Sequence, residues 1–381
     1  MLVSAETQNL GVVSAAEISQ AIGWRDLAVE GLFRTGGVSL IGKLARKRRV
    51  PVPRLAILCY HRIGTGGVPF YSQLAAENFE AQMYYLRKNY RVLSLDQLIQ
   101  EMKQPTNLEP AVAVTFDDGY RGLFAEAFPI LTAHQIPATI FLTVGAIETG
   151  EVAWYDRIFL ALQVAPGNTF DIELDQPRHF DLDSSASRMQ AAAEIISCLR
   201  AFSPERRKKC CLDLENRIPL PEDQLRGRML TWDQIRVMHH GGISFGAHTM
   251  THPVVSRLSP VEMEWEILES KRILENRLSA PVRHFAFPFG KQEECGDAAV
   301  SLLAGNGFAS AATTEWGLNS VGTNPLQLRR VQIGEMGSLA MFAFQLNRLF
   351  LQSDFGETGA MRQEPFSGQQ NVEIETQRVR Q

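Results

Sequence analysis

The sequence AVAVTFDDGY at residues 111–120 determines how the rest of the chain is interpreted. Its first six residues, 111–116, form a largely apolar run of strand length, which is typical of a parallel strand buried on both faces. Asp117 and Asp118 follow at once and therefore stand at the carboxyl end of that strand. Because the loops at these ends build the active sites of parallel α/β barrels, we expect the two carboxylates to take part in chemistry.

A second motif, HTMTHP at residues 248–253, follows another predicted strand and complements the aspartates. His248 and His252 are four residues apart, so on a helix or a tight turn their imidazoles lie on one side. Two imidazoles and one carboxylate can hold a divalent metal, with zinc favoured, and leave one coordination position free. Successive strand residues point apart, so one aspartate would bind the metal and the other would accept a proton from water. These residues predict a metal-assisted hydrolase.

Apolar runs of strand length alternate with helical patterns along most of the chain, which predicts parallel βα units. The alternation stops between residues 148 and 228, which we interpret as a helical insertion beside the cleft. Residues 1–53 are expected to form an N-terminal extension, and residues 54–347 the catalytic domain. Residues 348–381 have the composition of a disordered tail.

The composition is that of an ordinary globular protein, with 45% hydrophobic residues among 381 and a formal net charge of −4. This charge gives no reason to expect nucleic acid as a partner. The five cysteines are scattered without a CxxC pair, which argues against a disulfide framework and a cysteine zinc site.

The location of the protein is predicted from its N-terminal part. Residues 1–16 do not resemble a secretory signal, so we expect a cytoplasmic protein or one at the inner membrane periphery, with an extracytoplasmic location left open. Residues 32–51 mix apolar and basic side chains. They are either a solvated basic linker or a segment for peripheral contact with an anionic membrane.

Three motifs carry a resemblance to a known family, namely TFDDGY, the HxxxH of SFGAHTMTHP, and HFAFPFG at residues 284–290. Together they resemble the polysaccharide deacetylases of carbohydrate esterase family 4, and most of all its exopolysaccharide-type members. The resemblance covers about residues 54–344 and is interrupted by the insertion. It implies an α/β fold, a distorted (β/α)7 barrel, and removal of N-acetyl groups from an amino-sugar polysaccharide or oligosaccharide.

The resemblance also implies a role for each motif residue. Asp117 becomes the catalytic base. Asp118, His248 and His252 become the ligands of Zn²⁺ or another divalent metal. The backbone amide of Tyr120 becomes a candidate donor to the oxyanion that forms during hydrolysis.

Two features depart from the family pattern. The third motif of many relatives contains an arginine that pairs with the catalytic base, whereas residues 286–290 read AFPFG, so Arg329 or Arg330 would have to supply the charge. The late histidine that serves as general acid is also missing, because no histidine follows His284. His61, at the end of the first predicted strand, is expected either to replace it as proton donor or to be structural.

Five residues are predicted to contact the substrate: Phe287, Pro288 and Phe289 in the third motif, and Trp154 and Tyr155 in the insertion. Two alternatives to a polysaccharide deacetylase remain open. The same kind of site cleaves other C–N bonds, as in a deformylase or a cyclic-imide hydrolase. The chain could also be an inactive carbohydrate-binding relative, although the complete set of ligands and base argues against this.

Overall fold

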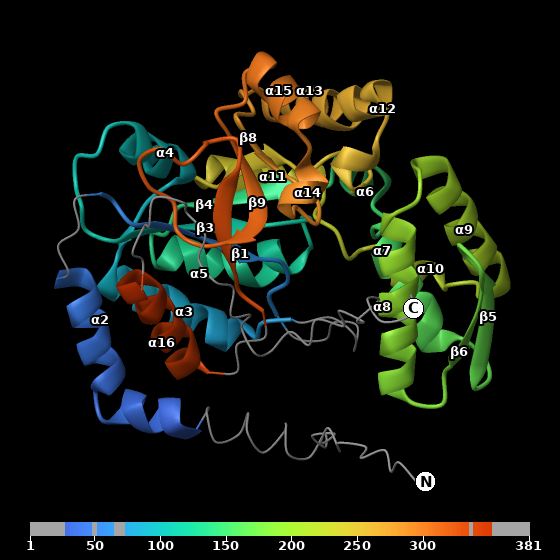
Figure 1. Ribbon diagram of the computed structural model, residues 1–381, viewed down its shortest axis with the longest axis horizontal. Coiled ribbons are helices and arrows are strands. Elements are labelled where there is room, and N and C mark those ends of the chain that lie inside the picture. Colours follow the sequence, from blue (N-terminus) through green and yellow to red (C-terminus); the bar gives the residue numbers. More distant parts are fainter. Residues whose placement is uncertain (1–26, 48–51, 65–72, 335–337, 353–381) are drawn as a thin grey trace, which may run out of the picture.

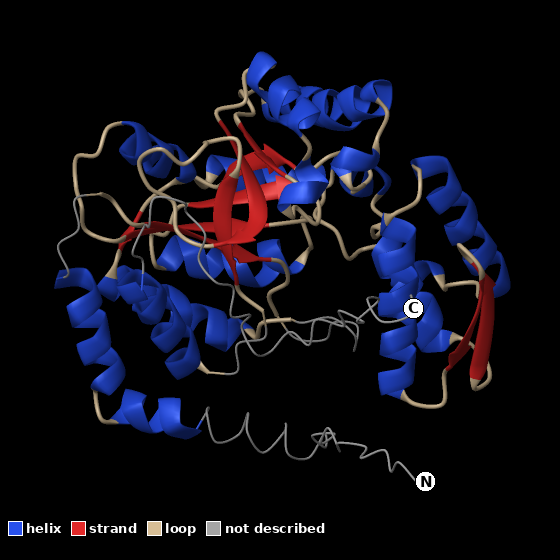
Figure 2. Ribbon diagram, in the orientation of Figure 1, coloured by secondary structure: helices blue, strands red, loops and turns tan. Residues whose placement is uncertain are grey.

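A closed barrel of parallel strands forms the centre of the computed structural model, which describes residues 27–47, 52–64, 73–334 and 338–352. Figure 2 shows the strands in red, enclosed by helices. The barrel strands are β1 (Leu55–Tyr60), β3 (Ala111–Phe116), β4 (Ala138–Leu142), β7 (Ser244–Ala247), β8 (His284–Ala286), β9 (Ser310–Trp316) and β10 (Leu328–Gln332). They pair in the order β1-β10-β9-β8-β7-β4-β3, and β3 pairs again with β1. The expected (β/α)7 barrel is confirmed.

Three of the helices around the barrel begin at residues that cap them through a side-chain hydrogen bond. Ser94, Thr231 and Ser259 each accept a hydrogen bond from the backbone amide three residues later, in capping boxes. The helical elements that follow the strands are α3 (Ala76–Asn89), α4 (Leu95–Lys103), η1 (Leu123–Ala127), α5 (Phe128–Ala133), α6 (Val144–Thr149), α11 (Trp232–His240), η2 (Val255–Arg257), α12 (Pro260–Glu264), η3 (Trp265–Glu269), α13 (Ser270–Leu278), α14 (Gln292–Cys295) and α15 (Asp297–Gly305). A short strand, β2 (Arg91–Val92), pairs with the start of β3 outside the barrel.

Alternate residues of each strand belong to two different parts of the core. Ala111 and Ala113 belong with Leu55, Phe141 and Leu328 to a cluster that fills the barrel interior. The residues between them pack in the main cluster, together with the surrounding helices. This alternation decides which polar side chains point into the barrel near the carboxyl ends of the strands.

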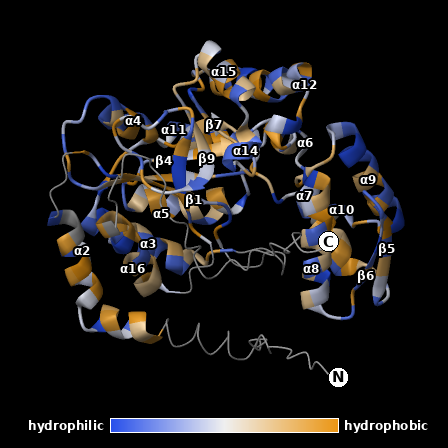
Figure 3. Ribbon diagram, in the orientation of Figure 1, coloured by the Kyte–Doolittle hydropathy of each residue, from blue (hydrophilic) through white to orange (hydrophobic). Residues whose placement is uncertain are grey.

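The insertion forms a separate lobe with its own hydrophobic cluster, at the right of Figure 1. Its elements are α7 (Trp154–Val164), β5 (Thr169–Glu173), β6 (Pro177–Asp181), α8 (Ser185–Arg200), α9 (Pro204–Arg217) and α10 (Glu222–Leu225). The lobe is not wholly helical, because β5 and β6 form an antiparallel hairpin. Residues 169–173 alternate exposed and buried, which is the strand pattern that the Asp-rich composition concealed. Helix α9 is coloured mostly hydrophilic in Figure 3.

The N-terminal extension packs on the last helix of the described chain. Helix α2 (Gly37–Lys47) lies against α16 (Leu339–Gln352), and the Asn347 side-chain amide donates to the carbonyl of Val38 at 3.1 Å. Leu40 and Leu44 of α2 remain exposed. The membrane contact expected for residues 32–51 stays a prediction, and residues 48–51 lie outside the described part.

Helix α16 extends past the expected domain boundary at residue 347, while residues 353–381 of the expected tail lie outside the described part. Among the described residues, every helix is too short or too polar to cross a bilayer.

Candidate active site

Asp117 lies against a buried arginine inside the barrel. Asp117 continues the inward-facing series of Ala113 and Thr115 beyond the end of β3, and Arg330 continues the same series from Leu328 on β10. The Arg330 guanidinium donates to both carboxylate oxygens of Asp117, at 2.7 and 2.8 Å, and its Nε donates to the carbonyl of Thr313. Of the two arginines considered from the sequence, the structure therefore places Arg330 against the expected base.

This ion pair controls the charge of Asp117. Burial alone would raise the pKa of Asp117, but Arg330, the nearby histidines and the hydrogen bonds from Arg330 hold it well below its usual range. Asp117 is therefore ionised at neutral pH, and its two oxygens are held in one orientation. The sequence analysis missed Cys59, whose buried thiol lies with Sγ 3.5 Å from Oδ2 of Asp117.

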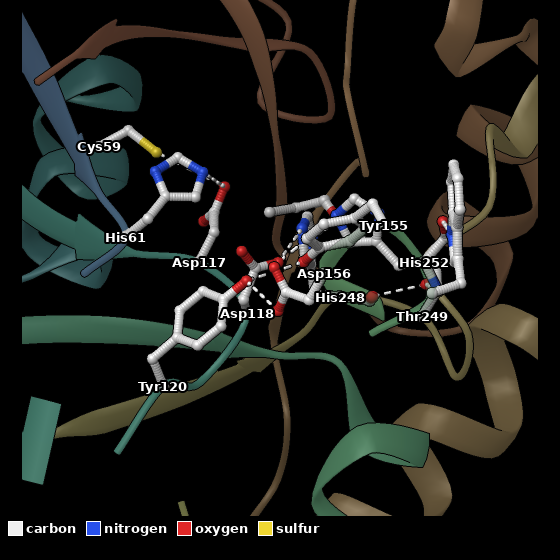
Figure 4. Close-up of polar contacts among 12 residues, drawn as sticks. Cys59, His61, Asp117, Asp118, Tyr120, Tyr155, Asp156, His248, Thr249 and His252 are labelled. Atoms are coloured by element: carbon white, nitrogen blue, oxygen red, sulfur yellow. Dashed lines mark hydrogen bonds and ion pairs between the residues drawn. The ribbon is translucent and has the colours of Figure 1, made fainter. Parts of the chain in front are cut away.

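His61 stands on the same side of the centre as Cys59 and Asp117, as Figure 4 shows. Its Nε2 lies 3.9 Å from Oδ2 of Asp117, and its side chain is 44% exposed. Desolvation by the surrounding residues lowers the pKa of His61, so the ring is neutral at neutral pH.

Asp118 turns the other way, toward the two histidines. Its backbone adopts the left-handed conformation, with φ of 70°, which aspartate tolerates better than most residues. Oδ1 of Asp118 lies 3.7 Å from Nε2 of His248 and 3.4 Å from Nε2 of His252. The Nδ1 of His248 lies 2.7 Å from the carbonyl of Ala286 and donates a hydrogen bond to it, so Nε2 is available as a ligand.

The chemistry of these three residues fits a divalent cation. One ligand atom from each of Asp118, His248 and His252 lies within 4.8 Å of the others. Oδ1 of Asp118 and Nδ1 of His252 are buried without a hydrogen-bond partner. Burial raises the pKa of Asp118 to about 6 and lowers the pKa of His252 well below its usual value. The buried carboxylate is thus unfavourable without a positive charge, and the imidazole is in its neutral, metal-binding form.

A cavity of about 480 Å³ opens above these residues. The barrel contributes Asp117, Asp118 and both histidines to its lining. The insertion contributes Tyr155, Phe159, Ile196 and Arg200, and therefore forms one wall. The guanidinium of Arg200 lies over the ring of Phe289, 4.1 Å from its centroid. This wall has aromatic faces and a positive charge next to the reacting centre, which suits a polar ligand with apolar ring faces.

A buried polar network joins the insertion to the barrel, and sequence reasoning missed two of its members. Asp156 of α7 accepts hydrogen bonds from the Tyr120 hydroxyl at 3.0 Å and from Arg62 at 2.5 Å. The hydroxyl groups of Tyr120 and Tyr155 lie 3.2 Å apart. Asp156 follows the aromatic pair Trp154 and Tyr155 at the start of a helix, but nothing local indicates that it meets Arg62, 94 residues away.

The five expected substrate residues divide into two groups. Tyr155 and Phe289 line the cavity. Phe287 is fully buried in the main core, where it packs edge-to-face on Phe285, so it cannot contact a substrate. Pro288 is buried as well. Trp154 is half-buried, and its Nε1 donates to the carbonyl of His252 at 3.1 Å, which makes it a neighbour of the histidine loop.

The sequence is similar to those of polysaccharide deacetylases. The sequence model of the family described as polysaccharide deacetylase matches residues 104–304, which is more than half of the chain. The protein YxkH of Bacillus subtilis (strain 168), whose name describes a candidate polysaccharide deacetylase, is 22% identical over 284 residues. That alignment covers 74% of this chain and 71% of YxkH.

Two solved structures share the fold. The Streptococcus pyogenes deacetylase PplD in complex with acetate has a TM-score of 0.53 at 20% identity and covers 78% of this chain and 99% of its own. IcaB from Ammonifex degensii has a TM-score of 0.50 at 19% identity and covers 77% of this chain and 97% of its own. At such identities the two structures show a common fold and nothing further.

The two adjacent aspartates should differ in their effect on metal content. We expect Asp118→Asn to lose stoichiometric divalent metal, because only the two histidines would remain as ligands and two ligands hold the ion weakly. Asp117→Asn should retain the metal, because that carboxylate faces Arg330 instead. Elemental analysis of both purified variants measures this. If Asp117→Asn lost its metal while Asp118→Asn kept it, the two roles would have to be exchanged.

Removing the charge of Arg330 should change both stability and pH dependence. In the wild type, the depressed pKa of Asp117 contributes stability above the ordinary carboxyl pKa, and this stability is lost only as the pH falls through the depressed value. In Arg330→Gln burial dominates, so the pKa of Asp117 rises and the acidic limb of the activity profile moves to higher pH.

The Arg330→Gln change should also lower the free energy of unfolding at neutral pH by about 3–5 kcal/mol, the usual effect of leaving a buried charge unpaired. Arg329→Gln, the neighbouring half-buried arginine of β10, is the matched control and should change neither quantity. Denaturant unfolding and the pH profile of hydrolysis give the two measurements. An unchanged acidic limb in Arg330→Gln would show that Arg330 does not set the charge of Asp117.

Proposed function

This chain belongs to the polysaccharide deacetylase family, and from that premise we propose that it removes N-acetyl groups from an amino-sugar polysaccharide or its precursor. The observation that carries this proposal is the separation of two adjacent carboxylates. Asp117 is paired with Arg330, whereas Asp118 faces His248 and His252. One carboxylate is therefore available to accept a proton, and the other to bind a cation, at the same cavity.

Members of this family depend on a divalent metal, and we propose Zn²⁺ for this chain. Bound to Asp118, His248 and His252, Zn²⁺ would polarise the acetamide carbonyl and stabilise negative charge on its oxygen. Asp117 would accept a proton from the attacking water, and Arg330 would keep its carboxylate ionised and oriented. The backbone amide of Tyr120 would be a second donor to the developing oxyanion.

We propose His61 as the group that delivers a proton to the leaving amine. Its position supports this role, because Nε2 lies 3.9 Å from Asp117 and the side chain is partly open to the cavity. Since its pKa is lowered, His61 would be neutral when the substrate binds. It would therefore first have to receive from Asp117 the proton that this carboxylate takes from the attacking water, and then pass it to the amine.

The cavity wall supports a sugar rather than a simple amide as substrate. Tyr155 and Phe289 offer ring faces beside polar groups, which is the chemistry that recognises pyranose rings. A deformylase or a cyclic-imide hydrolase would use the same metal centre. The complete set of base and ligands favours an enzyme over an inactive carbohydrate-binding protein.

Acetate release decides between these functions. The zinc-loaded protein should release acetate from N-acetylated chito-oligosaccharides, and Asp117→Asn should lower kcat by roughly 10²–10⁴-fold while keeping its metal. N-formyl amines and cyclic imides should be poor substrates. Binding of the oligosaccharide without acetate release would support the inactive relative, and preferential hydrolysis of the formyl or imide compounds would support the other hydrolases.

The role of His61 is tested by its effect on turnover and pH dependence. We expect His61→Ala to lower kcat far more than it raises KM, and to remove from the acidic limb of the pH profile the loss of activity that protonation of His61 causes in the wild type. His240→Ala, an exposed histidine of α11, is the control and should behave as the wild type. A near-normal kcat with an unchanged pH profile would make His61 a structural residue.

A further inference from the structure

The loop that carries both histidine ligands is bent into an unfavourable backbone conformation. Thr249 has φ of 66° and His252 has φ of 57°, both in the left-handed region. This region is unfavourable for residues other than glycine, and most of all for a β-branched residue such as threonine. Such a conformation persists only when the surrounding structure holds it in place.

The carbonyl groups of the loop are held from one side by the start of α6. The amide of Val144 donates to the carbonyl of Thr249 at 3.0 Å, and the amide of Gly145 donates to that of Met250 at 2.9 Å. A Cβ atom at Gly145 would lie 2.5 Å from the Met250 oxygen, so only glycine permits this approach. Both contacts join backbone atoms, so apart from the glycine at 145 they depend on no particular side chain.

The amide groups of the same loop are held by one buried carboxylate, that of Glu266. Its Oε2 accepts hydrogen bonds from the amides of Met250 and Thr251, both at 2.8 Å, and its Oε1 accepts one from the Thr251 hydroxyl. Glu266 is 3% exposed and lies on η3, a single turn of π-helix. Such turns are frequent at functional sites. Burial raises the pKa of the Glu266 carboxyl, and the hydrogen bonds from Thr251 and Met250, with the charge of the buried Arg207, act against this rise.

The last carbonyl of the loop is held by the insertion. Nε1 of Trp154, the first residue of α7, donates to the carbonyl of His252 at 3.1 Å. The indole contacts the ring of Phe289, with centroids 6.2 Å apart, and the guanidinium of Arg207 lies over it, 5.1 Å from its centroid. The Trp154 side chain therefore connects the lobe that forms the cavity wall to a metal ligand.

We propose that Glu266 and Trp154 are positioning residues that clamp the His248–His252 loop in its metal-binding conformation, so that the insertion takes part in metal affinity. Neither side chain belongs to the group that offers ligand atoms to the ion. Glu266 holds the loop from the barrel side, and Trp154 holds it from the side of the insertion. Without these contacts the loop would relax from its left-handed residues, and the imidazoles would lose the arrangement that three ligands require.

The clamp rests on the proposed metal site but not on the substrate, so metal affinity tests it directly. The dissociation constant for zinc is measured on the full chain by competition with a chromogenic chelator. We expect Glu266→Gln and Trp154→Phe each to raise this constant about 10–100-fold, the usual effect of removing a group that orients a metal ligand. Glu266→Gln preserves the shape of the side chain and removes the negative charge, whereas Trp154→Phe keeps an aromatic ring and removes the indole N–H.

Two matched controls lie on the surface beside Glu266. Glu264→Gln and Trp265→Phe make the same chemical changes at exposed positions, so both should bind zinc as the wild type does. Thermal unfolding of each metal-free variant identifies any that fails to fold. If Glu266→Gln fails, Thr251→Val replaces it, because this change removes only the hydroxyl bond to Glu266 and should also raise the dissociation constant.

The outcomes separate the clamp from the proposed function. Wild-type zinc affinity in folded Trp154→Phe together with wild-type affinity in Glu266→Gln, or in its replacement, would overturn the clamp while leaving the hydrolase intact. A wild-type chain that binds no divalent metal would refute both. Raised dissociation constants in the clamp variants, with normal values in the controls, would support the clamp whatever the substrate is.

Discussion

The bidentate ion pair between Arg330 and Asp117 is the interaction on which the active centre depends. Both groups are fully or almost fully buried, and each would be unfavourable there without the other. They are 213 residues apart in sequence, on β10 and directly after β3, and they meet only because β1 pairs with both strands and closes the barrel. The negative charge of Asp117, the expected base, is therefore stabilised only when the barrel is closed.

A second constraint keeps the neighbouring carboxylate separate from this pair. The left-handed backbone at Asp118 turns its side chain away from Asp117 and toward the histidines. At the facing strand end, Thr249 and His252 adopt the same strained region. The proposed metal site therefore lies between two strained turns, each supported by hydrogen bonds from outside the barrel strands; at the first, the amide of Thr143 donates to the carbonyl of Asp118 at 3.3 Å. This arrangement explains why helix η3 and the insertion both approach the centre.

The sequence predicted the elements that carry local signals and missed those that depend on distant contacts. The strands before Asp117 and His248 are short and apolar, so composition was enough to identify them. The hairpin was not expected in an insertion interpreted as helical, because its strands are short and rich in charged residues, although Phe170 and Ile172 alternate with exposed positions. Phe287 was expected at the substrate because it lies in a family motif, but it faces the core.

The sequence by itself determined which residue types stand at two strand ends, because ligand chemistry and strand burial are local properties of the chain. It therefore indicated a carboxylate and imidazole centre on an α/β barrel. Only the tertiary structure decided that Arg330 and not Arg329 meets Asp117, that Asp156 meets Arg62, and that Trp154 holds a histidine carbonyl. Each of these depends on which face of a strand or helix turns toward a partner far away in sequence. That orientation follows from barrel closure and lobe packing, for which no short stretch of sequence carries a signal.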